Sequence, residues 1–536
     1  MRISELKMSA AMPQDLRRVS RIAAHLSAAP AAASFAAPPM LIGGELCAHL
    51  SAAPAAASFA APPMLIGGEL CQAEGGKVAD VLNPATGQPF ACVPDASEAD
   101  LDRAVAAAKT AFGSWKKTSF AERARCLTAF ADALEAKKTD FAKALTMEQG
   151  KPLMFAMGEV MTVIKDARQF AATGELKPVV TADTKKARHE LHFLPRGVVG
   201  AITPWNFPLM MAANKILPAV TTGNTVVLKP SPYTPLATVM LSALAAEAFP
   251  AGVMNILTGG NSLGQRIVEH PDIAHISFTG SAATGKRIMA TGASKLKKLT
   301  LELGGNDAAL VLPDASVAKI APAIFQKSMF NTGQVCIAIK RLFVHESQYD
   351  EMCAALAKEA AAAKVGDGMA KGTAYGPINN KMQLERVEGL VADARARGAN
   401  VIAGGQRVAT ETGGYFYAPT IVRDVTEGMR IVDEEQFGPV LPVIKYSSVE
   451  DAVRRANDSD FGLGASVWTA DPTGRGVDVA RELEAGMTWI NDHLAQPDTL
   501  PFGGIKTSGI GREGGGEIGL KEFCDMRTLT IPYPKK

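Results

Sequence analysis

Three polar residues occur in sequence settings that could support covalent catalysis. Cys336 ends the segment FNTGQVC, directly after a Gly-Gln turn, and a reactive cysteine acts as its thiolate. Glu302 lies in the apolar run LELGG, where a carboxylate is costly unless it finds a partner or keeps its proton. Asn206 stands between two prolines in PWNFP, which makes its side-chain amide a preorganised donor. These types could supply a nucleophile, a general base and a hydrogen-bond donor, although each alone is more often structural.

A second group of residues has features of a phosphate-binding site. TGSAATG, which ends at Gly285, follows the apolar run HISF and precedes a helical stretch. Gly280 and Gly285 would let a helix N-terminus approach a phosphate, and Ser281 could donate to it. Lys229 ends the apolar run TVVLKP, and the strand ends of parallel sheets face ligand crevices. The G-x-G-x-x-G fingerprint does not follow the early strands, so this turn alone is a weak signal.

Alternating β-rich and helical runs surround these residues. Strands are predicted at 198–203, 225–230, 275–280, 308–312 and 341–345, near 401 and near 421. Helical spacing occurs at 101–112, 121–145, 235–249 and 349–363. Strand, helix and strand at this spacing predict parallel α/β units in two successive domains. A polar, alternating stretch at 175–194 predicts a protruding hairpin.

Composition excludes several classes of protein. The chain has 536 residues and a formal net charge of +2, so its charge gives no reason to expect a nucleic-acid partner. Its apolar runs fall short of the roughly 20 residues of a membrane span. The 7 cysteines lack close pairs, which argues against a disulfide framework or a zinc site. Reduced thiols of this kind indicate a cytoplasmic location.

The N-terminal region contains an identical duplication, because residues 24–47 recur without change as residues 48–71. Two Ala/Pro-rich copies are too few for a solenoid. We expect residues 1–63 to form an extension that is poorly packed up to about residue 60. Its arginine-rich start weakly resembles an organellar targeting segment, which is the alternative to a cytoplasmic location.

The motifs, taken in order, resemble the aldehyde dehydrogenase superfamily from about Leu65 to the C-terminus. The matching elements are NPATG, ExGKP, PWNFP, VVLKP, FTGSxxTG, LELGG, GQVC, EEQFGPV and PFGGIKTSGIGRE. The resemblance implies an α/β fold of two Rossmann-like parallel α/β domains plus a small β oligomerisation element. It divides the chain into a coenzyme-binding domain (64–176 and 196–303), a catalytic domain (304–507) and an oligomerisation element (177–195 and 508–536).

The resemblance assigns catalytic roles to the first three residues. Cys336 corresponds to the nucleophile, which attacks an aldehyde to give a thiohemiacetal and, after hydride transfer, a thioester. The Asn206 amide and the Cys336 N–H would hold the developing oxyanion. Glu302 corresponds to the general base that activates water for thioester hydrolysis. This Glu favours hydrolysis over acyl transfer to coenzyme A, because the CoA-dependent members of the family typically lack it.

The resemblance also implies NAD as the cofactor. The positions that match cofactor contacts are Trp205, Lys229, Ser231, Gly280, Ser281, Gly285, Glu435 and Phe437. The chain departs from the family pattern at Pro232, where strongly NAD-preferring relatives have a Glu that binds ribose hydroxyls. Without that carboxylate a 2′-phosphate is not repelled, so NADP stays open. We expect no metal site, because the chemistry resembles no metal enzyme.

The expected partners are a small aldehyde and further copies of this chain, with neither nucleic acid nor membrane. The family assembles as a homodimer or a homotetramer, in which the hairpin and a C-terminal strand at 527–532 would pair across subunits. The positions that match the substrate tunnel include Asn214, His493, Gln496 and Asp498, and they favour a neutral or polar aldehyde.

Two other functions stay open. A cysteine-dependent hydrolase or acyltransferase would need a base beside Cys336, and no His is recognisable as one from the sequence. A non-catalytic relative is the other alternative, and the joint presence of Asn206, Glu302 and Cys336 argues against it.

Overall fold

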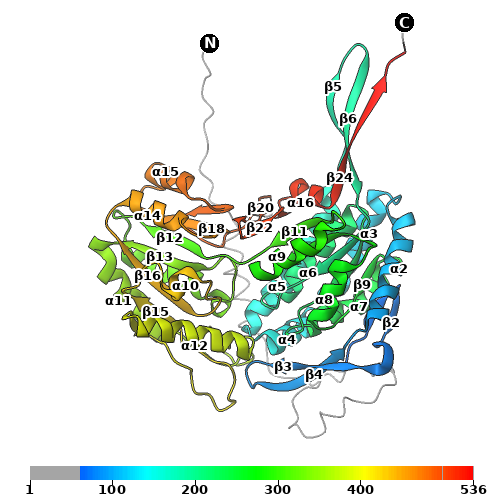
Figure 1. Cartoon of the computed structure of the whole chain (residues 1–536). Helices are drawn as coiled ribbons and strands as arrows, with labels where there is room; N and C mark the ends of the chain where they lie inside the picture. The colour runs from blue at the N-terminus through cyan, green and yellow to red at the C-terminus, as the bar shows by residue number, and fades with distance from the viewer. Residues whose placement is uncertain (1–60, 498, 535–536) are drawn as a thin grey trace. The chain divides into compact units, whose positions relative to one another are not determined.

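The structure is a computed structural model, and it describes residues 61–497 and 499–534. The expected poor packing of the N-terminal extension concerns residues that lie outside this range. Two sheets rich in parallel strands and a separate three-stranded sheet organise the described chain (Figure 1). The predicted α/β fold with two parallel sheets is therefore confirmed.

The first sheet is formed by apolar strands in the order β2-β1-β9-β8-β7-β10-β11-β22. These strands are β1 (Met64–Ile66), β2 (Glu69–Cys71), β7 (Val198–Ile202), β8 (Thr225–Lys229), β9 (Met254–Ile256), β10 (Ile273–Thr279), β11 (Lys298–Glu302) and β22 (Gly509–Ile510). β7 to β11 are parallel, whereas β1 and β22 pair antiparallel. Every residue of β7 and β8 is buried, as expected for parallel strands covered on both faces. The strands predicted at 198–203, 225–230 and 275–280 are confirmed.

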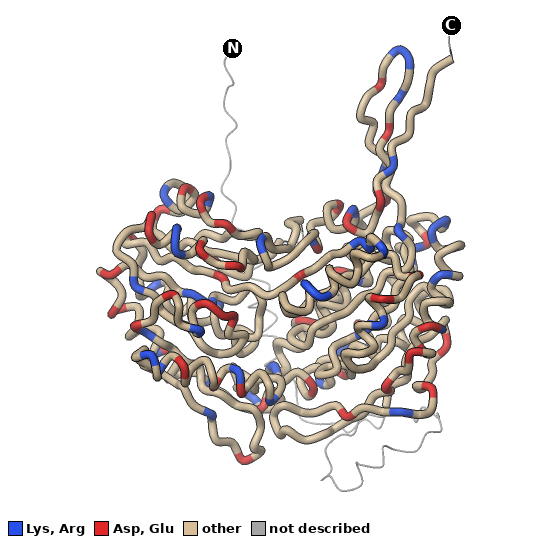
Figure 2. The backbone as a smooth tube through the Cα atoms, in the orientation of Figure 1, with Lys and Arg blue, Asp and Glu red and all other residues tan. Residues whose placement is uncertain are grey.

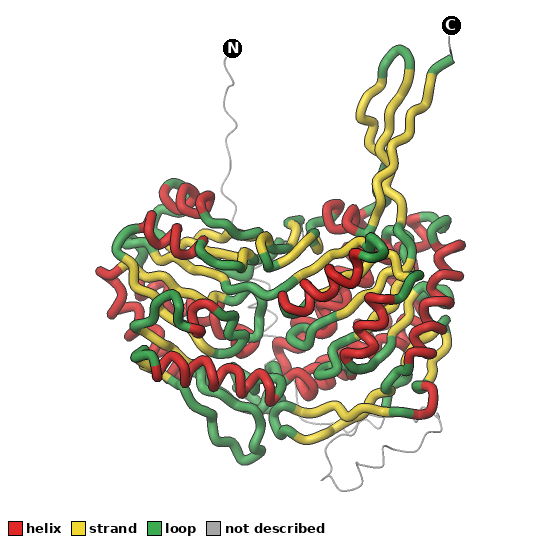
Figure 3. The backbone as a smooth tube through the Cα atoms, in the orientation of Figure 1, coloured by secondary structure: helices red, strands yellow, loops and turns green. Residues whose placement is uncertain are grey.

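Helices flank the strands of this sheet (Figure 3). They are α2 (Glu98–Trp115), α3 (Phe120–Ala136), α4 (Lys138–Gln149), α5 (Leu153–Thr173), α6 (Pro208–Thr221), α7 (Leu236–Ala248), α8 (Asn261–Glu269) and α9 (Ala282–Ala293). Ser97 and Ser119 begin α2 and α3 with capping boxes, which satisfy amides that the first turn leaves unpaired. The helical spacing at 121–145 forms two helices, because Lys137 has φ −111° and ψ 10° and interrupts the helical backbone.

The second sheet has the strand order β14-β15-β16-β13-β12-β18-β19. Its strands are β12 (Asp307–Val311), β13 (Ile339–His345), β14 (Asn400–Ala403), β15 (Thr420–Arg423), β16 (Val440–Tyr446), β18 (Gly464–Trp468) and β19 (Met487–Ile490). All pairings are parallel except that of β14 with β15. The helices of this part are α10 (Val317–Met329), α11 (Tyr349–Ala362), α12 (Lys381–Ala396), α13 (Arg430–Asp433), α14 (Val449–Asn457) and α15 (Arg475–Glu482). The strands predicted at 308–312 and 341–345 correspond to β12 and β13.

The third sheet confirms the predicted hairpin and corrects its pairing. β5 (Val179–Asp183) and β6 (Ala187–Pro195) form the hairpin, and β24 (Cys524–Pro532) lies beside β6 (Figure 1). β24 pairs with β6 of its own chain from Cys524 opposite Pro195 to Pro532 opposite Ala187. β6 is therefore the central strand, and only the outer edges of β5 and β24 could pair with another subunit.

The remaining short elements are β3 (Val78–Asn83), β4 (Gln88–Pro94), β17 (Phe461–Gly462), β20 (Pro501–Phe502), β21 (Ile505–Lys506), β23 (Glu513–Gly514) and α16 (Glu517–Glu522). Basic and acidic residues are interspersed over the described chain (Figure 2). Within that chain no helix combines the length and the apolar character needed to cross a membrane. The same residues contain no cluster of His, Cys, Asp and Glu suited to a metal ion.

Candidate active site

The carboxyl ends of four neighbouring strands in the first sheet meet at one edge. Lys229 at the end of β8 is in register with Ile202 of β7, and Glu302 at the end of β11 is in register with Thr279 of β10. β7 and β10 are neighbours, but the chain continues from β7 to β8 on one side and from β10 to β11 on the other. Such a reversal of strand order opens a crevice at the carboxyl edge, which is where ligands bind in open α/β sheets.

The turn after β10 leads directly into the N-terminus of α9. Gly280 donates its amide to the Glu302 carbonyl at 3.0 Å, which fixes the turn against β11. Ser281 is the N-cap of α9, and its Oγ accepts from the Thr284 amide at 3.3 Å. A Cβ at Gly285 would lie 2.6 Å from the Leu303 side chain, so glycine allows this close packing without a shift of Leu303. The sequence interpretation of this turn as a helix terminus that could bind a phosphate agrees with the geometry.

Lys229 is buried where β8 ends. Its Nζ donates to the carbonyls of Pro230 at 2.7 Å and Gly259 at 3.0 Å. Burial lowers the pKa of this ammonium to about 8, and the charge of Asp95 opposes that effect. The nearby Ser231 is also buried, and its Oγ accepts from the Tyr233 amide at 3.2 Å. Both predicted cofactor residues are therefore held rigidly at the edge of the sheet.

The second sheet contributes residues from the amino ends of its strands. Cys336 precedes β13, and both Glu435 and Phe437 precede β16. The Phe437 ring meets the Trp205 ring edge to face, with centroids 5.1 Å apart and planes at 87°. Trp205 follows β7 of the first sheet, so this contact joins the carboxyl edge of one sheet to the amino edge of the other.

A left-handed turn positions the segment that ends at Cys336. Asn331, Thr332 and Gly333 have φ values of 50°, 58° and 70°. A Cβ at Gly333 would overlap the Gly438 carbonyl, so only glycine fits there. Left-handed backbone costs energy at Asn and Thr, and such strain persists only where surrounding contacts enforce it. Here the Asn331 side chain donates to the Asn206 carbonyl at 3.0 Å and Thr332 Oγ1 donates to the Gly376 carbonyl at 3.0 Å.

Asn206 is directed at this segment. Its Nδ2 donates to the Gln334 carbonyl at 3.0 Å, two residues before Cys336. The Asn206 carbonyl accepts from Lys151 Nζ at 2.9 Å, and Lys151 forms a buried ion pair with Glu159 at 2.5 Å. The structure thus brings the predicted amide donor and the predicted nucleophile segment together.

Glu159 links this ion pair to helix α6. Its Oε1 accepts from the amides of Leu209 at 3.0 Å and Met210 at 3.1 Å, in the first turn of the helix. A carboxylate at a helix N-terminus is stabilised by the unpaired amides there. Lys151 belongs to the ExGKP motif, but its spacing gave no indication that it supports Asn206, and the sequence reasoning missed Glu159 altogether.

Cys336 belongs to a small apolar cluster that includes Val335, Ile337, Phe207 and Phe330. Although part of the residue is accessible, its thiol is enclosed by protein, and this burial raises its pKa to about 12. The charge of Lys340 lowers the thiol pKa, whereas Glu435, Asp307 and Glu302 raise it further. The thiol is therefore protonated at neutral pH, and its reaction requires a base or an added positive charge.

Glu302 is enclosed at the end of β11 and is only 2% exposed. Neither of its carboxylate oxygens has a hydrogen-bond partner among the described residues. Burial and the nearby Glu513 raise the pKa of Glu302 well above its ordinary value, and Lys215 and Arg512 oppose that shift. Of the two outcomes that the sequence left open for this carboxylate, a partner or a retained proton, the structure favours the proton.

Lys215 on α6 joins Glu513 to Thr279 of the first sheet, and its charge lies near Glu302. Its Nζ donates to Glu513 Oε1 at 2.5 Å and to Thr279 Oγ1 at 2.7 Å, and the side chain is fully buried. Glu513 lies in β23, far along the chain from α6. The pair therefore depends on the fold, and neither residue was identified from the sequence.

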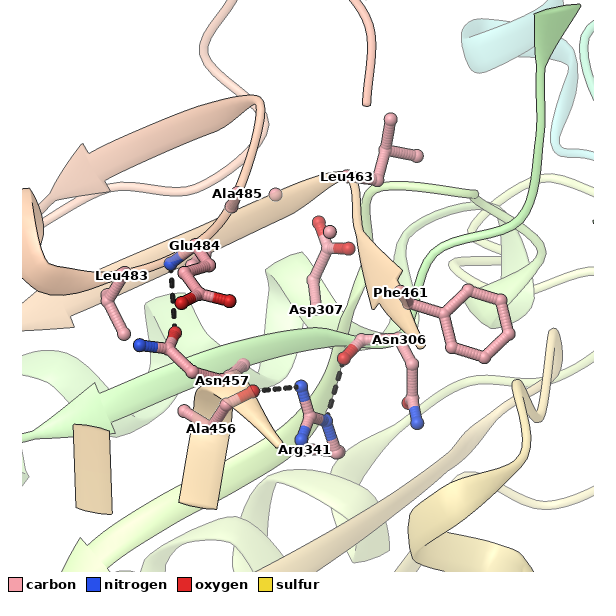
Figure 4. Close-up of a pocket in the computed structure, with 14 residues that line it drawn as sticks. Asn306, Asp307, Arg341, Ala456, Asn457, Phe461, Leu463, Leu483, Glu484 and Ala485 are labelled. Carbon is pink, nitrogen blue, oxygen red and sulfur yellow. Dashed lines mark hydrogen bonds between the residues drawn. The ribbon is translucent and has the colours of Figure 1, made fainter. Parts of the chain in front are cut away.

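A small pocket lies at the amino ends of β12 and β18 (Figure 4). In its wall, Arg341 Nε donates to the Asn306 carbonyl at 2.8 Å and Nη2 donates to the Ala456 carbonyl at 3.0 Å (Figure 4). Asp307 also lines the pocket and is fully buried. None of the catalytic or cofactor residues predicted from the sequence lines this pocket.

His493 lies beneath the nucleophile segment and is fully buried. Its Nε2 is 2.7 Å from the Ile337 carbonyl, which accepts, and 3.6 Å from Asp307 Oδ2. The side chain therefore supports the chain next to Cys336 instead of adding polarity to an open tunnel. Gln496 is exposed and Asn214 is partly exposed, whereas Asp498 lies outside the described residues.

Loops from two parallel sheets thus meet near one cysteine, and a serine-capped helix begins at the carboxyl edge of the first sheet. This is the architecture of an α/β enzyme. The model of the aldehyde dehydrogenase family matches residues 71–529. The mitochondrial aldehyde dehydrogenase of Leishmania tarentolae is 42% identical over 465 residues, which cover 85% of this chain and 91% of the relative. Human retinal dehydrogenase 2 is 40% identical over 476 residues, 87% of this chain and 90% of the relative. The NAD+ complex structure of aldehyde dehydrogenase from Bacillus cereus is 40% identical, has a TM-score of 0.86, and covers 88% of this chain and 97% of its own. The chain belongs to the aldehyde dehydrogenase family.

Proposed function

We propose that the chain oxidises an aldehyde to a carboxylic acid with NAD(P)+, through a thioester on Cys336. The observation that carries this proposal is the hydrogen bond of 3.0 Å from Asn206 Nδ2 to the Gln334 carbonyl. It holds a side-chain amide against the segment that ends at the nucleophile, although the two residues lie far apart in the sequence.

In acylation, the Cys336 thiolate attacks the aldehyde carbon, and the oxygen that gains the negative charge lies between the Asn206 amide and the Cys336 N–H. Removing one such donor typically costs about two to three orders of magnitude in rate. Deprotonation of the thiol is the difficult step, because burial holds its pKa at about 12. Glu302 and the positive charge of Lys340 are the groups of this chain that could assist it.

In deacylation, Glu302 takes a proton from the water that attacks the thioester carbonyl, and the Cys336 thiolate leaves. The raised pKa of Glu302 makes it a stronger base once it has lost its proton. Its carboxylate faces Gly503, where a Cβ would lie 2.8 Å from Oε1. A larger residue at this position would crowd the carboxylate, so glycine allows the close approach of this segment to Glu302.

The residues at the carboxyl edge of the first sheet fit a dinucleotide. The N-terminus of α9, capped by Ser281, would hold the pyrophosphate, and Lys229 would reach a ribose. Trp205 and Phe437 would flank the cofactor near the nucleophile, with Glu435 beside them. NAD(P)+ held by these residues would supply the hydride acceptor for the oxidation. The relative of known structure was solved with NAD+, which supports NAD, while the exposed Pro232 leaves a 2′-phosphate unopposed.

The surroundings of Cys336 favour a neutral aldehyde with an apolar substituent. Phe207 and Phe330 stack with centroids 6.1 Å apart, and Trp489, Leu494 and Phe502 pack against the same cluster. The polar Asn214, predicted to match the tunnel, is partly exposed. This extends the expectation of a neutral or polar aldehyde by assigning the apolar end of the substrate to the inner part of the site.

We also propose that the chain assembles as a homodimer or homotetramer. The division into coenzyme-binding, catalytic and oligomerisation segments belongs to the same proposal. The edges of β5 and β24 support it, because Val179, Val180 and Met526 are exposed there. Exposed apolar residues on an edge strand are typical of a surface that another subunit covers.

The test is a screen of hexanal, benzaldehyde and succinic semialdehyde with NAD+ and with NADP+, followed by absorbance of the reduced cofactor. We expect turnover with hexanal or benzaldehyde that exceeds turnover with succinic semialdehyde. Hydrolysis of esters without reduction of either cofactor by any aldehyde would instead support a cysteine-dependent hydrolase.

A further inference from the structure

Lys340 occupies an unusual position next to the nucleophile. Its Nζ donates to the carbonyl of Val335 at 2.7 Å and to the carbonyl of Cys336 at 2.6 Å. The Val335 carbonyl and the Cys336 N–H are the two ends of one peptide group. The geometry points to Lys340 as a positioning residue that polarises this peptide and strengthens the Cys336 N–H as a donor to the oxyanion. This inference rests on the proposed role of Cys336.

The planarity of the peptide makes this coupling direct. A trans peptide points its C=O and its N–H to opposite sides, and the described chain contains no cis peptide bond. The ammonium of Lys340 therefore lies on the side away from the substrate oxygen. The Val335 carbonyl also accepts from the Ala338 amide at 3.1 Å, so two donors draw electron density toward the carbonyl oxygen. Hydrogen bonds in such a chain strengthen one another.

Burial makes the charge of Lys340 effective at this distance. The side chain is 3% exposed, and its Nζ is 3.5 Å from Glu435 Oε1. Electrostatic interactions are stronger in a protein interior than in water. Its three donors are directed at two carbonyls and one carboxylate, which leaves the ammonium little freedom to turn away.

Glu435 connects this arrangement to the other sheet. Its Oε1 also accepts from the Gly305 amide at 3.1 Å, at the junction between β11 and β12. Lys340 is thus fixed between the nucleophile peptide and a carboxylate proposed to lie beside the cofactor. A lysine that only stabilised the fold would not need contact with the peptide that provides the oxyanion donor.

Two reactions of the Cys336 sulfur distinguish an effect of Lys340 on the oxyanion from an effect on the reactivity of the thiol. Acylation by 4-nitrophenyl acetate passes through a tetrahedral oxyanion: the Cys336 thiolate attacks the carbonyl and 4-nitrophenolate leaves. Alkylation by iodoacetamide displaces iodide and forms no oxyanion. Both rates depend on the amount of thiolate. The ratio of acylation to alkylation at one pH therefore measures how strongly the site stabilises the oxyanion.

The experiment compares this ratio in the wild-type enzyme, Lys340→Met, Lys340→Arg and Lys297→Met, with Cys336→Ser to subtract other thiols. Lys297 is a matched control because its Nζ also donates to two main-chain carbonyls, those of His270 at 2.6 Å and Ile273 at 2.5 Å. It precedes β11, at the opposite edge of the first sheet.

We expect Lys340→Met to lower the ratio about tenfold, less than the loss of a whole donor because the N–H remains. Lys340→Arg should restore most of it, since a guanidinium also donates to carbonyls and keeps the charge. Lys297→Met should leave the ratio within about twofold of wild type, whatever its effect on stability.

A ratio that is unchanged in Lys340→Met, with acylation and alkylation reduced in parallel, would overturn the inference. If Lys340→Met does not fold, the same measurement on Lys340→Gln decides, because a neutral amide can donate to the carbonyls but lacks the charge. An unchanged ratio in that variant would also contradict the role of the charge. A different result would contradict the proposed function itself: Cys336→Ser would then still oxidise aldehydes.

Discussion

The two parallel sheets present their functional residues at opposite strand ends. In the first sheet, Lys229, Glu302 and the turn that begins at Gly280 all follow the carboxyl ends of strands. In the second sheet, Cys336 and Glu435 precede the amino ends of β13 and β16. The first arrangement follows the general rule for ligand sites in α/β sheets, whereas the second does not.

The two edges also differ in how they hold their residues. The first edge uses regular devices: strand register, a serine-capped helix and a glycine that allows close packing. The second edge uses a left-handed turn at 331–333 and buried charges that raise or lower the thiol pKa. We infer that Lys229 and the turn at Gly280, on the first edge, bind the cofactor, and that Cys336 on the second edge reacts with help from Asn206 and Glu302 of the first. Damage to the cofactor residues should therefore spare the chemistry of the sulfur, and damage to Asn206 should spare cofactor binding.

The largest expected effect concerns Asn206, which connects the two edges. Asn206→Ala should lower kcat about 100- to 1000-fold, because one donor to the oxyanion is lost. The dissociation constant for NAD+ should stay within about twofold, since no contact of Lys229 or α9 changes. Stopped-flow hydride transfer and fluorescence titration of NAD+ measure the two quantities. A variant that loses cofactor affinity as strongly as turnover would contradict the division between the edges.

Lys229 provides the opposite test, at the cofactor edge. Lys229→Met should raise the dissociation constant for NAD+ about 10- to 100-fold, the usual cost of a hydrogen bond from a charged group. Acylation of Cys336 by 4-nitrophenyl acetate without cofactor should be unaffected, because the hydrogen bonds of Lys229 go to Pro230 and Gly259 and not to the segment of Cys336. Lys297→Met controls for the loss of a lysine that donates to two main-chain carbonyls. Equal losses in both assays would mean that Lys229 supports the fold as a whole.

At the second edge, the raised pKa of the Cys336 thiol predicts how its alkylation rate changes with pH. With a pKa of about 12, Cys336 should react with iodoacetamide about tenfold faster for each pH unit between 7 and 10, without a plateau. Cys336→Ser gives the background from other cysteines such as the partly exposed Cys71. A plateau below pH 8 in the enzyme without cofactor would show that the thiol is already activated, contrary to its burial.

The smallest expected effect is on stability. The pKa of Glu302 is raised above its ordinary value of 4.5 by burial, so above that pH the unfolded chain loses a proton that the native state keeps. Wild-type stability should therefore fall with rising pH by up to about 1.4 kcal/mol per unit for this group. Glu302→Gln removes the titration, so its melting temperature should rise relative to wild type as the pH increases above 4.5.

Glu388 provides a control, because its pKa is shifted in the direction opposite to that of Glu302. It pairs with Arg407 at 2.6 Å, which lowers its pKa, so its contribution is present at high pH and lost as the pH falls through the lowered value. The difference between Glu388→Gln and wild type should stay constant from pH 6 to pH 8. A constant difference for Glu302→Gln over that range would contradict a proton retained on Glu302.

Much of the first edge could be predicted from the sequence, because its signals are local. A strand run followed by Lys229, or by the glycines and Ser281, already indicates a site at a strand end. The second edge depends on contacts between distant segments. Asn206 and Gln334 are 128 residues apart, and Gly305 and Glu435 are 130 apart.

The supporting residues escaped prediction for the same reason. In the sequence, Lys151 and Glu159 look like ordinary charged residues of a helical region. Only the structure shows that they form a buried ion pair and that Lys151 holds the Asn206 carbonyl. Lys340 follows Cys336 closely, yet its bonds to two carbonyls depend on the turn of 331–333 and on Glu435. The motifs and the family resemblance indicated which groups are proposed to react, whereas the fold determines how they are held.

The most direct test of the account is to trap the acyl group and locate it. Glu302→Gln is mixed with NAD+ and an excess of the aldehyde that the wild-type enzyme oxidises best, quenched in acid and digested for peptide mass mapping. We expect a burst of reduced cofactor and the acyl mass on the peptide that contains Cys336, because deacylation is slowed more than hydride transfer. A burst without an adduct on that peptide, or with an adduct on another cysteine, would contradict it.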